Sequence, residues 1–403
     1  MIKRFLTILI AFLLVHAACA QRRVDIPFRA VWIASVAGID WPSPASRGNT
    51  VQQMEEMCGI LDSLAELGIN TIIFQVRPTA DALYRSPYEP LSHWVTGQQG
   101  EWRGQQPYDP LKFVLDEAHR RHMDVHVWLN PYRVTQGVMT REQLHKSHVI
   151  NRHPEWFCRY NGHWYFNPGL DSTRLWICRV VADLVRRYDI QGVHMDDYFY
   201  PYPVSGQVFP DEATFRKYPR GFDNIGDWRR NNTNMVIREL HDTIKAIKPE
   251  VQFGISPFGV WRNYREDTLG SHTKALTNYD KLYADIRLWM QRGWIDYVVP
   301  QLYWEIGHQL ADYEHLCHWW AENRFQTRLY IGMAPYRLGR KGEAAAWQRG
   351  NEIVRQMYLN RTIPGIEGEV FYSTRPLLRN PRHVCDSIKM FYAPYLPREE
   401  FAK

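Results

Sequence analysis

Short apolar runs alternate along the chain with longer segments in which apolar residues recur every three or four positions. The short runs are typical of strands buried in a parallel sheet, and the longer segments of helices that pack one face against it. Residues 28–35 form the first run, and Met57, Leu61 and Leu64 carry the helical spacing in residues 51–67. This order predicts a strand followed by a helix, which is the repeating unit of α/β folds.

The same unit recurs along the whole chain. We predict eight strands, at residues 28–35, 70–76, 125–129, 192–195, 251–256, 295–303, 328–333 and 368–373. Helices are predicted at residues 51–67, 109–122, 172–187, 228–247, 279–292, 311–323 and 343–359, with a closing helix at 376–391. Eight strands alternating with helices over about 370 residues predict a single α/β domain, residues 21–403, folded as one (β/α)8 TIM-type barrel with long loops after the strands.

Two adjacent carboxylates, Asp196 and Asp197, directly follow the fourth predicted strand. Burying two ionised carboxylates costs several kcal/mol unless they are paired or used in chemistry. Ligands bind at the carboxyl ends of the strands in parallel α/β folds. We therefore expect both aspartates at the floor of an active site. The alternative is that they cap the next turn or pair with a neighbouring arginine.

Carboxylates, amides and aromatic side chains also follow the other strands. Rings can cover the apolar faces of sugars while acids and amides bind the hydroxyls, so the pattern predicts a carbohydrate site. We expect Trp128, Trp176 and Trp289 to be core residues, and Trp32, Trp94, Trp261 and Trp304 to contact substrate. The predicted substrate-binding residues are Trp32, Arg77, Asp81, Asn130, Tyr132, Tyr198, Trp261, Gln301, Tyr303 and Trp304.

Glycoside hydrolysis requires a carboxylic acid that protonates the leaving oxygen and a second carboxylate that attacks the sugar or activates water. Asp197 or Asp196 supplies one, and side-chain alternation predicts that only one of the two faces the barrel axis. Glu305 is the leading partner, because Trp304 beside it could exclude water from a general acid. Asp81 is the second candidate. For each of these partners a structural ion pair is the alternative.

The first 20 residues resemble a secretory signal peptide. Lys3 and Arg4 precede an apolar run, and Ala18-Cys19-Ala20 offers a cleavage site, which predicts export to the periplasm or cell envelope. His16 stands where lipoprotein signals usually have Leu, so we expect membrane association only if Cys19 is lipidated.

Without those residues the chain has 47 Lys and Arg against 43 Asp and Glu, a charge of +4 that is too small and dispersed to indicate nucleic acid. Five cysteines remain at irregular spacing, most of them expected to be buried, and one bridge between Cys158 and Cys178 is compatible with export. Serine-hydrolase and nucleotide-binding motifs are absent, and we predict no cofactor and no metal.

Several stretches together resemble the glycosyl-hydrolase-like family 10 of bacterial cell-envelope proteins. They are RAVWIASVAGIDWPS (29–43), NTIIFQVRPTADALYRSPYEP (70–90), VWLNPYR (127–133), GVHMDDYFYPYP (192–203), ISPFGVWRN (255–263) and DYVVPQLYWEIG (296–307). The resemblance covers roughly residues 26–340 in order. It implies a TIM-type barrel and glycoside hydrolysis, because members include a glycosidase that acts on peptidoglycan strands stripped of their peptides.

The resulting hypothesis is an exported glycoside hydrolase whose partner is a polysaccharide, with denuded peptidoglycan or a related amino-sugar glycan as the first candidate substrate. Asp197, Asp196 and Glu305 are its predicted catalytic residues. One alternative is a carbohydrate-binding protein that uses the same barrel without catalysis. Another is a polysaccharide deacetylase, which would release acetate.

Overall fold

The computed structural model of the protein describes residues 27–100, 102, 108–137 and 140–396. The predicted signal peptide, with Cys19, lies outside these ranges. Within them, none of the helices combines the length and the apolar character that crossing a membrane requires.

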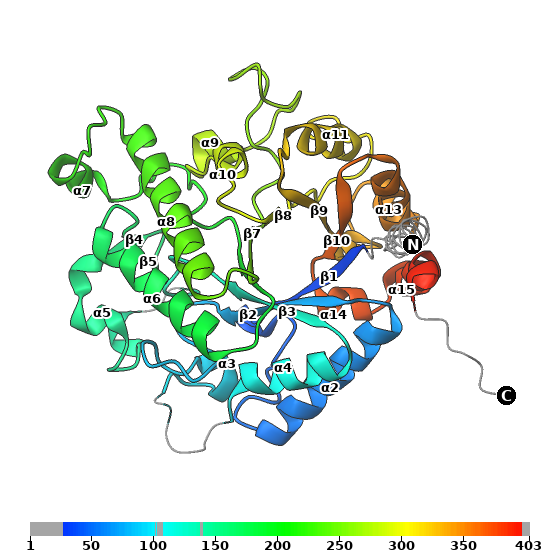
Figure 1. Cartoon of the computed structure of the whole chain (residues 1–403), viewed down its shortest axis with the longest axis horizontal. Coiled ribbons are helices and arrows are strands. Elements are labelled where there is room, and N and C mark those ends of the chain that lie inside the picture. The colour runs from blue at the N-terminus through cyan, green and yellow to red at the C-terminus, as the bar shows by residue number, and fades with distance from the viewer. Residues whose placement is uncertain (1–26, 101, 103–107, 138–139, 397–403) are drawn as a thin grey trace, which may run out of the picture.

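Eight parallel strands form a closed barrel at the centre of the molecule (Figure 1). Closure follows from β1, which pairs with β2 on one side and with β10 on the other. The barrel strands are β1 (Phe28–Ile33), β2 (Thr71–Arg77), β3 (Asp124–Leu129), β6 (Gly192–Met195), β7 (Gln252–Ile255), β8 (Tyr297–Val298), β9 (Arg328–Met333) and β10 (Ile366–Phe371). The predicted (β/α)8 barrel is confirmed, with each strand within a few residues of its expected place.

Helices lie around the outside of the barrel (Figure 1). Three of the longer ones begin at a side chain that caps the free backbone N–H groups of the first turn, as the residue types Asn49, Asp109 and Asn224 favour. The helices of the outer layer are α2 (Thr50–Glu66), α4 (Pro110–Arg120), α6 (Asp171–Arg187), α8 (Ile225–Ile247), α9 (Asn278–Lys281), α10 (Ile286–Gln291), α11 (Tyr313–Asn323), α13 (Glu352–Thr362), α14 (Thr374–Leu378) and α15 (Val384–Tyr392).

Three helices predicted as continuous are interrupted in the structure by residues with positive φ, a conformation that ends an α-helix. The interruptions lie at Tyr283 (φ 53°) within 279–292, Gly350 (φ 83°) within 343–359 and Asn380 (φ 51°) within 376–391. After the first of them Asp285 restarts the helix, because its side chain accepts a hydrogen bond of 3.2 Å from the Leu288 N–H. Apolar periodicity continues across these breaks, which is why it did not reveal them.

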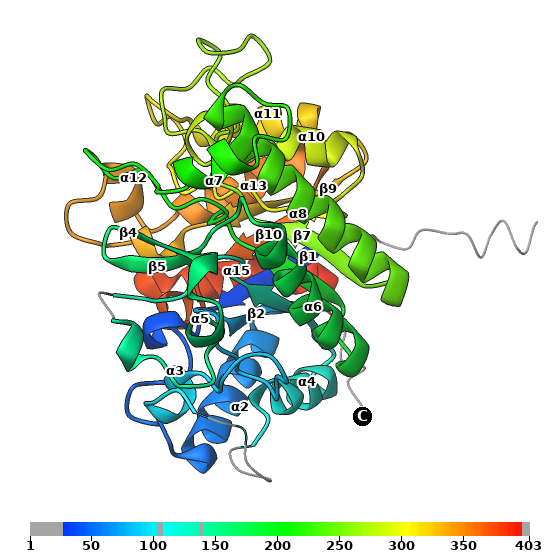
Figure 2. The ribbon, with the colours of Figure 1, turned by 90° about the vertical axis from the view of Figure 1, so that its left-hand side faces the viewer.

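The loops that follow strands are long and those that precede strands are short, as predicted. Residues 130–170 connect β3 to α6, for example, whereas residues 188–191 suffice to connect α6 to β6. The long loops carry the extra elements α3 (His93–Thr96), α5 (Val149–Arg152), β4 (Phe157–Tyr160), β5 (His163–Phe166), α7 (Glu212–Lys217) and α12 (Ala345–Gln348). Several of these, including β4, β5 and α12, lie towards the left of Figure 2.

The hairpin of β4 and β5 was not predicted. The strands are antiparallel, and both residues of the connecting turn, Asn161 (φ 49°) and Gly162 (φ 77°), have positive φ. An Asn-Gly pair between apolar runs is a strong hairpin signal, because both residues tolerate this conformation. That signal was present in the sequence and would have located the hairpin.

The core has two layers that follow the alternation of side chains along the strands. Outward residues such as Val31 and Phe74 pack against the helices, and inward residues such as Trp32 and Ile73 fill the barrel. Gly254 leaves room for the ring of Tyr297, because a Cβ there would lie 2.0 Å from Tyr297 Cζ. The prediction that Trp128, Trp176 and Trp289 belong to the core is confirmed, with exposed fractions of 6%, 6% and 0%.

A buried hydrogen-bonded network occupies the barrel interior. Trp32 Nε1 donates to His194 Nε2 (3.2 Å), so the proton of this imidazole is on Nδ1, which donates to the Tyr297 hydroxyl (3.0 Å). The Tyr297 hydroxyl in turn donates to His126 Nδ1 (2.8 Å), and Ser256 Oγ lies 2.9 Å from His194 Nε2. Burial lowers the pKa of His126 to about 3 and that of His194 well below its usual value, so both imidazoles are neutral. The network fixes the interior by polar contacts without a buried charge.

The cysteines form no bridge between Cys158 and Cys178, contrary to that expectation. Both are buried free thiols, and they belong to different elements, Cys158 to β4 and Cys178 to α6. Cys158 Sγ contacts the carbonyl oxygen of Pro210 at 3.6 Å. Burial raises the pKa of both thiols to about 12, which makes them unreactive packing residues.

Candidate active site

Asp196 and Asp197 lie at the carboxyl end of β6, where the sequence predicted them. The strand ends at Met195, and the two aspartates that follow are 4% and 3% exposed. Within the strand His194 faces the barrel interior and Met195 faces the helices. Asp196 continues the inward series, because its carboxylate contacts the inward ring of Trp128.

Asp196 is held by neutral donors from β3 and from the loop that follows that strand. Trp128 Nε1 donates to Oδ2 (3.1 Å), and Asn130 Nδ2 lies 3.0 Å from Oδ1 and 3.2 Å from Oδ2. The Tyr198 N–H lies 3.4 Å from Oδ1. Burial raises the pKa of Asp196, but the positive charge of Arg133 and the hydrogen bonds from Asn130 and Trp128 act against that rise. These partners all stabilise the ionised carboxylate.

Asp197 has a different environment, which favours its protonated form. Burial, and next the negative charge of Asp196, raise the pKa of Asp197 from 3.8 to about 7. The Tyr202 hydroxyl donates to Asp197 Oδ2, and Gln301 also stabilises the ionised form, so the two limit the rise. At neutral pH this carboxyl group can therefore both hold and release a proton, which is the property that a general acid and base requires.

Aromatic rings lie beside the pair in two groups. The ring of Tyr202 lies 6.2 Å from that of Phe258, which lies 5.5 Å from the ring of Trp304. In the second group, the centroids of Tyr336 and Tyr372 each lie 6.0 Å from that of Tyr303.

Tyr303 also lies close to the aspartates. Its pKa is raised well above its usual value by burial and then by the neighbouring tyrosines and Asp197. Sequence reasoning did not single out Tyr202 or Phe258, because both lie in loops whose path has no periodic signal. The Tyr-Pro-Tyr-Pro run at residues 200–203, with two rigid prolines just after the aspartates, was the available sign of a constrained loop.

Glu305, the predicted partner acid, follows β8 and is half-buried. Trp347 Nε1 donates to Glu305 Oε2 at 2.8 Å. Among the described residues, no hydrogen bond or ion pair joins Glu305 to either aspartate. Trp304, the residue before Glu305, belongs to the first aromatic group. A catalytic role for Glu305 stays a prediction.

Arg77 and Asp81 are both fully buried, and each is already paired within the protein. Arg77 forms two hydrogen bonds with Glu89, of 2.7 and 2.6 Å, and its NH1 donates to the Asn130 carbonyl (2.5 Å). Asp81 Oδ2 lies 3.2 Å from His93 Nδ1. Burial acts to raise the pKa of Asp81, but the hydrogen bond and charge of His93, with further hydrogen bonds, lower it below its usual value.

Arg77 thus holds the backbone carbonyl of Asn130 in place. The predicted substrate contact of Arg77 and of Asp81 is not tested by these pairings and stays a prediction.

The remaining predicted site residues divide into two sets. The first set lies close to the aspartates. Hydrogen bonds from Asn130 and Gln301 act to lower the pKa values of Asp196 and Asp197, respectively, and the negative charge of Asp197 acts to raise those of Tyr198 and Tyr303. The structure places the others deeper: Tyr132 is 1% exposed, Trp32 lies in the interior network, and Trp261 stacks on Trp319 at 5.9 Å and donates to Asp285.

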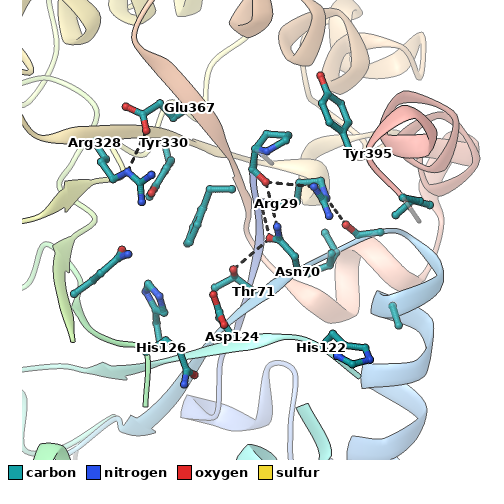
Figure 3. A pocket seen from close by; sticks show the side chains of 18 of the residues that line it. Arg29, Asn70, Thr71, His122, Asp124, His126, Arg328, Tyr330, Glu367 and Tyr395 are labelled. Atoms are coloured by element: carbon teal, nitrogen blue, oxygen red, sulfur yellow. Dashed lines mark hydrogen bonds and ion pairs between the residues drawn. The ribbon is translucent and has the colours of Figure 1, made fainter. Parts of the chain in front are cut away.

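A cavity of about 1080 Å³ lies at the other end of the barrel (Figure 3). Its walls include Asn70, Asp124 and Arg328, which precede or begin strands, together with Arg29 and His126. The Arg328 guanidinium forms an ion pair with Glu367 there (3.1 Å). Neither Asp196 nor Asp197 lines this cavity, so it is separate from the candidate active site.

Solved glycoside hydrolases share the fold. The chain aligns with an α-L-fucosidase, isoenzyme 2 of Paenibacillus thiaminolyticus, at a TM-score of 0.57 and 13% identity, covering 91% of this chain and 49% of that one. It aligns with the PgaB (BpsB) glycoside hydrolase domain of Bordetella bronchiseptica at a TM-score of 0.54 and 11% identity, covering 90% of this chain and 98% of that one. In fold, the protein is therefore a TIM barrel of the kind found in glycoside hydrolases.

Sequence comparison gives the family. The family model described as Glycosyl hydrolase-like 10 matches residues 27–348. The chain is 44% identical to Glycosyl hydrolase YngK of Bacillus subtilis (strain 168), over 96% of this chain and 76% of the relative. It is 41% identical to Glycosyl hydrolase DigH of Escherichia coli (strain K12), over 86% of this chain and 82% of the relative. The chain belongs to the glycosyl hydrolase-like 10 family, which confirms the resemblance read from its motifs.

Proposed function

We propose that the protein is a glycosidase that cleaves O-glycosidic bonds in a polysaccharide by acid and base catalysis. The observation that carries the proposal is the pair of buried neighbouring carboxyl groups, whose pKa values are both raised but whose hydrogen-bond partners differ. Asp196 accepts hydrogen bonds from Trp128 and Asn130, whereas the pKa of Asp197 is raised to about 7. Two titratable groups whose environments differ in this way are suited to the roles of charged carboxylate and proton donor.

In this mechanism Asp197 protonates the oxygen of the leaving sugar. Positive charge then develops on the anomeric carbon, and the ionised Asp196 stabilises it through space or by forming a bond. Asp197, now deprotonated, takes a proton from the incoming water. Glu305 is the alternative second carboxylate, and the aromatic groups around Phe258 and Tyr303 supply surfaces for sugar rings.

The first candidate substrate is an amino-sugar glycan, in particular a peptidoglycan strand without its peptides. Family membership supports a carbohydrate substrate, and the N-terminal signal pattern supports action outside the cytoplasm, in the periplasm or cell envelope. Lipid attachment at Cys19 remains a separate hypothesis. It predicts that the full-length protein partitions into detergent and that Cys19→Ala abolishes this.

The test is the release of new reducing ends from purified denuded glycan strands. We expect the wild type to release them and Asp197→Asn to lower the rate by a factor of about 10² to 10⁴ while still binding glycan, since a positioned acid contributes about that much. Asp116→Asn, which changes an exposed aspartate on α4, is the control and should keep full activity.

Each alternative gives a different result. A wild type that binds strands without releasing ends would be the non-catalytic binding protein. One that releases acetate in place of reducing ends would be the deacetylase.

A further inference from the structure

Arg133 lies on the loop after β3 and is held in place beside the candidate active site. Its backbone N–H donates to Asn130 Oδ1 (2.8 Å), the same Asn130 whose Nδ2 binds Asp196. A β-bridge joins Arg133 to Tyr165 on β5. The hairpin that sequence analysis missed thus fixes this residue next to the aspartates.

The Arg133 guanidinium has an open edge. Nε donates to the Pro78 carbonyl (3.1 Å), and the guanidinium carbon lies 5.4 Å from the centre of the Tyr198 ring, which covers one face. Within the described part of the chain, NH1 and NH2 have no hydrogen-bond or ion-pair partner. Neither nitrogen is fully enclosed by protein atoms, so both reach solvent.

The Arg133 guanidinium lies close to the candidate active site, because it stacks on the ring of Tyr198, the residue that directly follows Asp197. The charge of Arg133 acts on Asp196, on Tyr198 and on Tyr372, which surround the catalytic position. Three other arginines are each paired with a carboxylate: Arg77 at the end of β2 with Glu89, Arg229 on α8 with Asp211, and Arg337 after β9 with Glu343. Asp196 is not a hydrogen-bonded ion-pair partner of Arg133, because the hydrogen bonds to its carboxylate come from Trp128, Asn130 and the Tyr198 backbone.

A half-buried guanidinium with one face stacked and two donors free along its edge is suited to a planar anion. Two parallel N–H groups match the two oxygens of a carboxylate, and such charge-assisted pairs are roughly twice as strong as neutral hydrogen bonds. A neutral sugar hydroxyl would engage only one donor and leave the charge uncompensated.

We propose that Arg133 recognises a carboxylate on the substrate, so that this protein prefers glycans whose sugars carry free carboxylates to neutral glycans. The inference rests on the proposed function, because it concerns the same site. It also gives a reason for the substrate suggested above: removing the peptides from a peptidoglycan strand leaves a free carboxylate on the lactyl group of each muramic acid. An amide bond at that group removes the charge, and one oxygen is replaced by nitrogen.

Binding and cleavage are measured on matched soluble strands, one set with free carboxylates and one in which the carboxylates have been converted to primary amides. Binding is measured by calorimetry in the Asp197→Asn background, so that it does not depend on turnover. We expect the amide strands to bind at least tenfold more weakly. Adding Arg133→Met should weaken binding of carboxylate strands by a similar factor and leave binding of amide strands unchanged, and Arg133→Lys should recover part of the loss.

Cleavage by otherwise wild-type protein gives a second readout. Arg133→Met should raise KM on carboxylate strands about tenfold with a smaller change in kcat, and should not raise KM on amide strands. The control Arg159→Met removes an exposed cation from β4 of the neighbouring hairpin and should change neither value. An oligomer of a uronic acid distinguishes the source of the carboxylate: competition by it would indicate any sugar carboxylate, and failure to compete would indicate the lactyl group.

Equal binding of carboxylate and amide strands would overturn the proposal, as would an Arg133→Met variant that weakens both equally. The latter would make Arg133 a residue that only positions Asn130 and Asp196. A preference for carboxylate strands without any release of reducing ends would instead refute the proposed glycosidase activity and leave carboxylate recognition standing.

Discussion

Replacing Asp197 with Asn should stabilise the protein at alkaline pH while lowering the rate of the proposed reaction. The carboxyl group has a pKa of about 7 in the folded protein against 3.8 for a free aspartate. Its folded pKa is raised, so its contribution to stability is fully present below pH 4 and is lost as the pH rises to about 7. Asn cannot ionise, and its side-chain oxygen can still accept the hydrogen bond from Tyr202.

The magnitude follows from proton linkage. Each tenfold difference in proton affinity between the folded and unfolded states is worth about 1.4 kcal/mol. The raised pKa of Asp197 therefore lowers the stability of the folded state by about 2 kcal/mol at pH 5, where only the unfolded chain has ionised this group, and by about 4 kcal/mol at pH 8. The stability of Asp197→Asn relative to the wild type should increase by roughly 2 to 3 kcal/mol between these two pH values.

Urea unfolding of both proteins at pH 5, 6, 7 and 8 measures this difference. Asp81→Asn is the matched control, since Asp81 is also fully buried but its pKa is lowered. Its ionised form stabilises the folded state fully above pH 4, so the difference in stability between Asp81→Asn and the wild type should stay constant from pH 5 to pH 8. A difference between Asp197→Asn and the wild type that is the same at pH 5 and pH 8 would refute the assignment of a raised pKa to Asp197.

Three further predictions concern activity and the support of the site. The value of kcat/KM should fall as the pH rises through about 7, because Asp197 must be protonated. Tyr202→Phe should move this fall to higher pH, because it removes a hydrogen-bond donor to the ionised carboxylate and so raises the pKa of Asp197 further. A fall that stays at the same pH in Tyr202→Phe would exclude Asp197 as its origin. Arg77→Met should lower the free energy of unfolding by about 3 to 5 kcal/mol, because it leaves the buried Glu89 without its ion-pair partner. The double variant Arg77→Met with Glu89→Leu should lower it less, and urea unfolding measures both. Glu305→Gln keeps a side-chain oxygen that can accept the hydrogen bond from Trp347. If Glu305 is the partner acid, kcat of this variant should fall at least 10²-fold. A fall below about threefold would show that Glu305 is not a catalytic residue.

Substrate recognition in this site depends on elements outside the barrel strands. The hairpin of β4 and β5 fixes Arg133, and the loop after β6 supplies Tyr202. Relatives that keep the barrel but change these two loops would keep the aspartates and alter the sugars that they accept, because loops vary more readily than the strands they connect.

The sequence by itself determined the barrel and the position of the aspartates. Strand and helix periodicity is a local property, since it records which side chains face the core within one element. The position of Asp196 and Asp197 after an apolar run is equally local, and the parallel fold then places that strand end at the ligand-binding face.

Tertiary structure alone decided the surroundings of each carboxylate. Asn130 and Trp128 bind Asp196 across 66 and 68 positions of sequence, and no local pattern records such partners. Arg77, predicted as a substrate contact, is joined to Glu89 inside the protein, and Arg133 is left with open donors. Charge and hydrogen bonding act through space over a few ångströms, so the roles of these groups depend on which distant segments the barrel brings together.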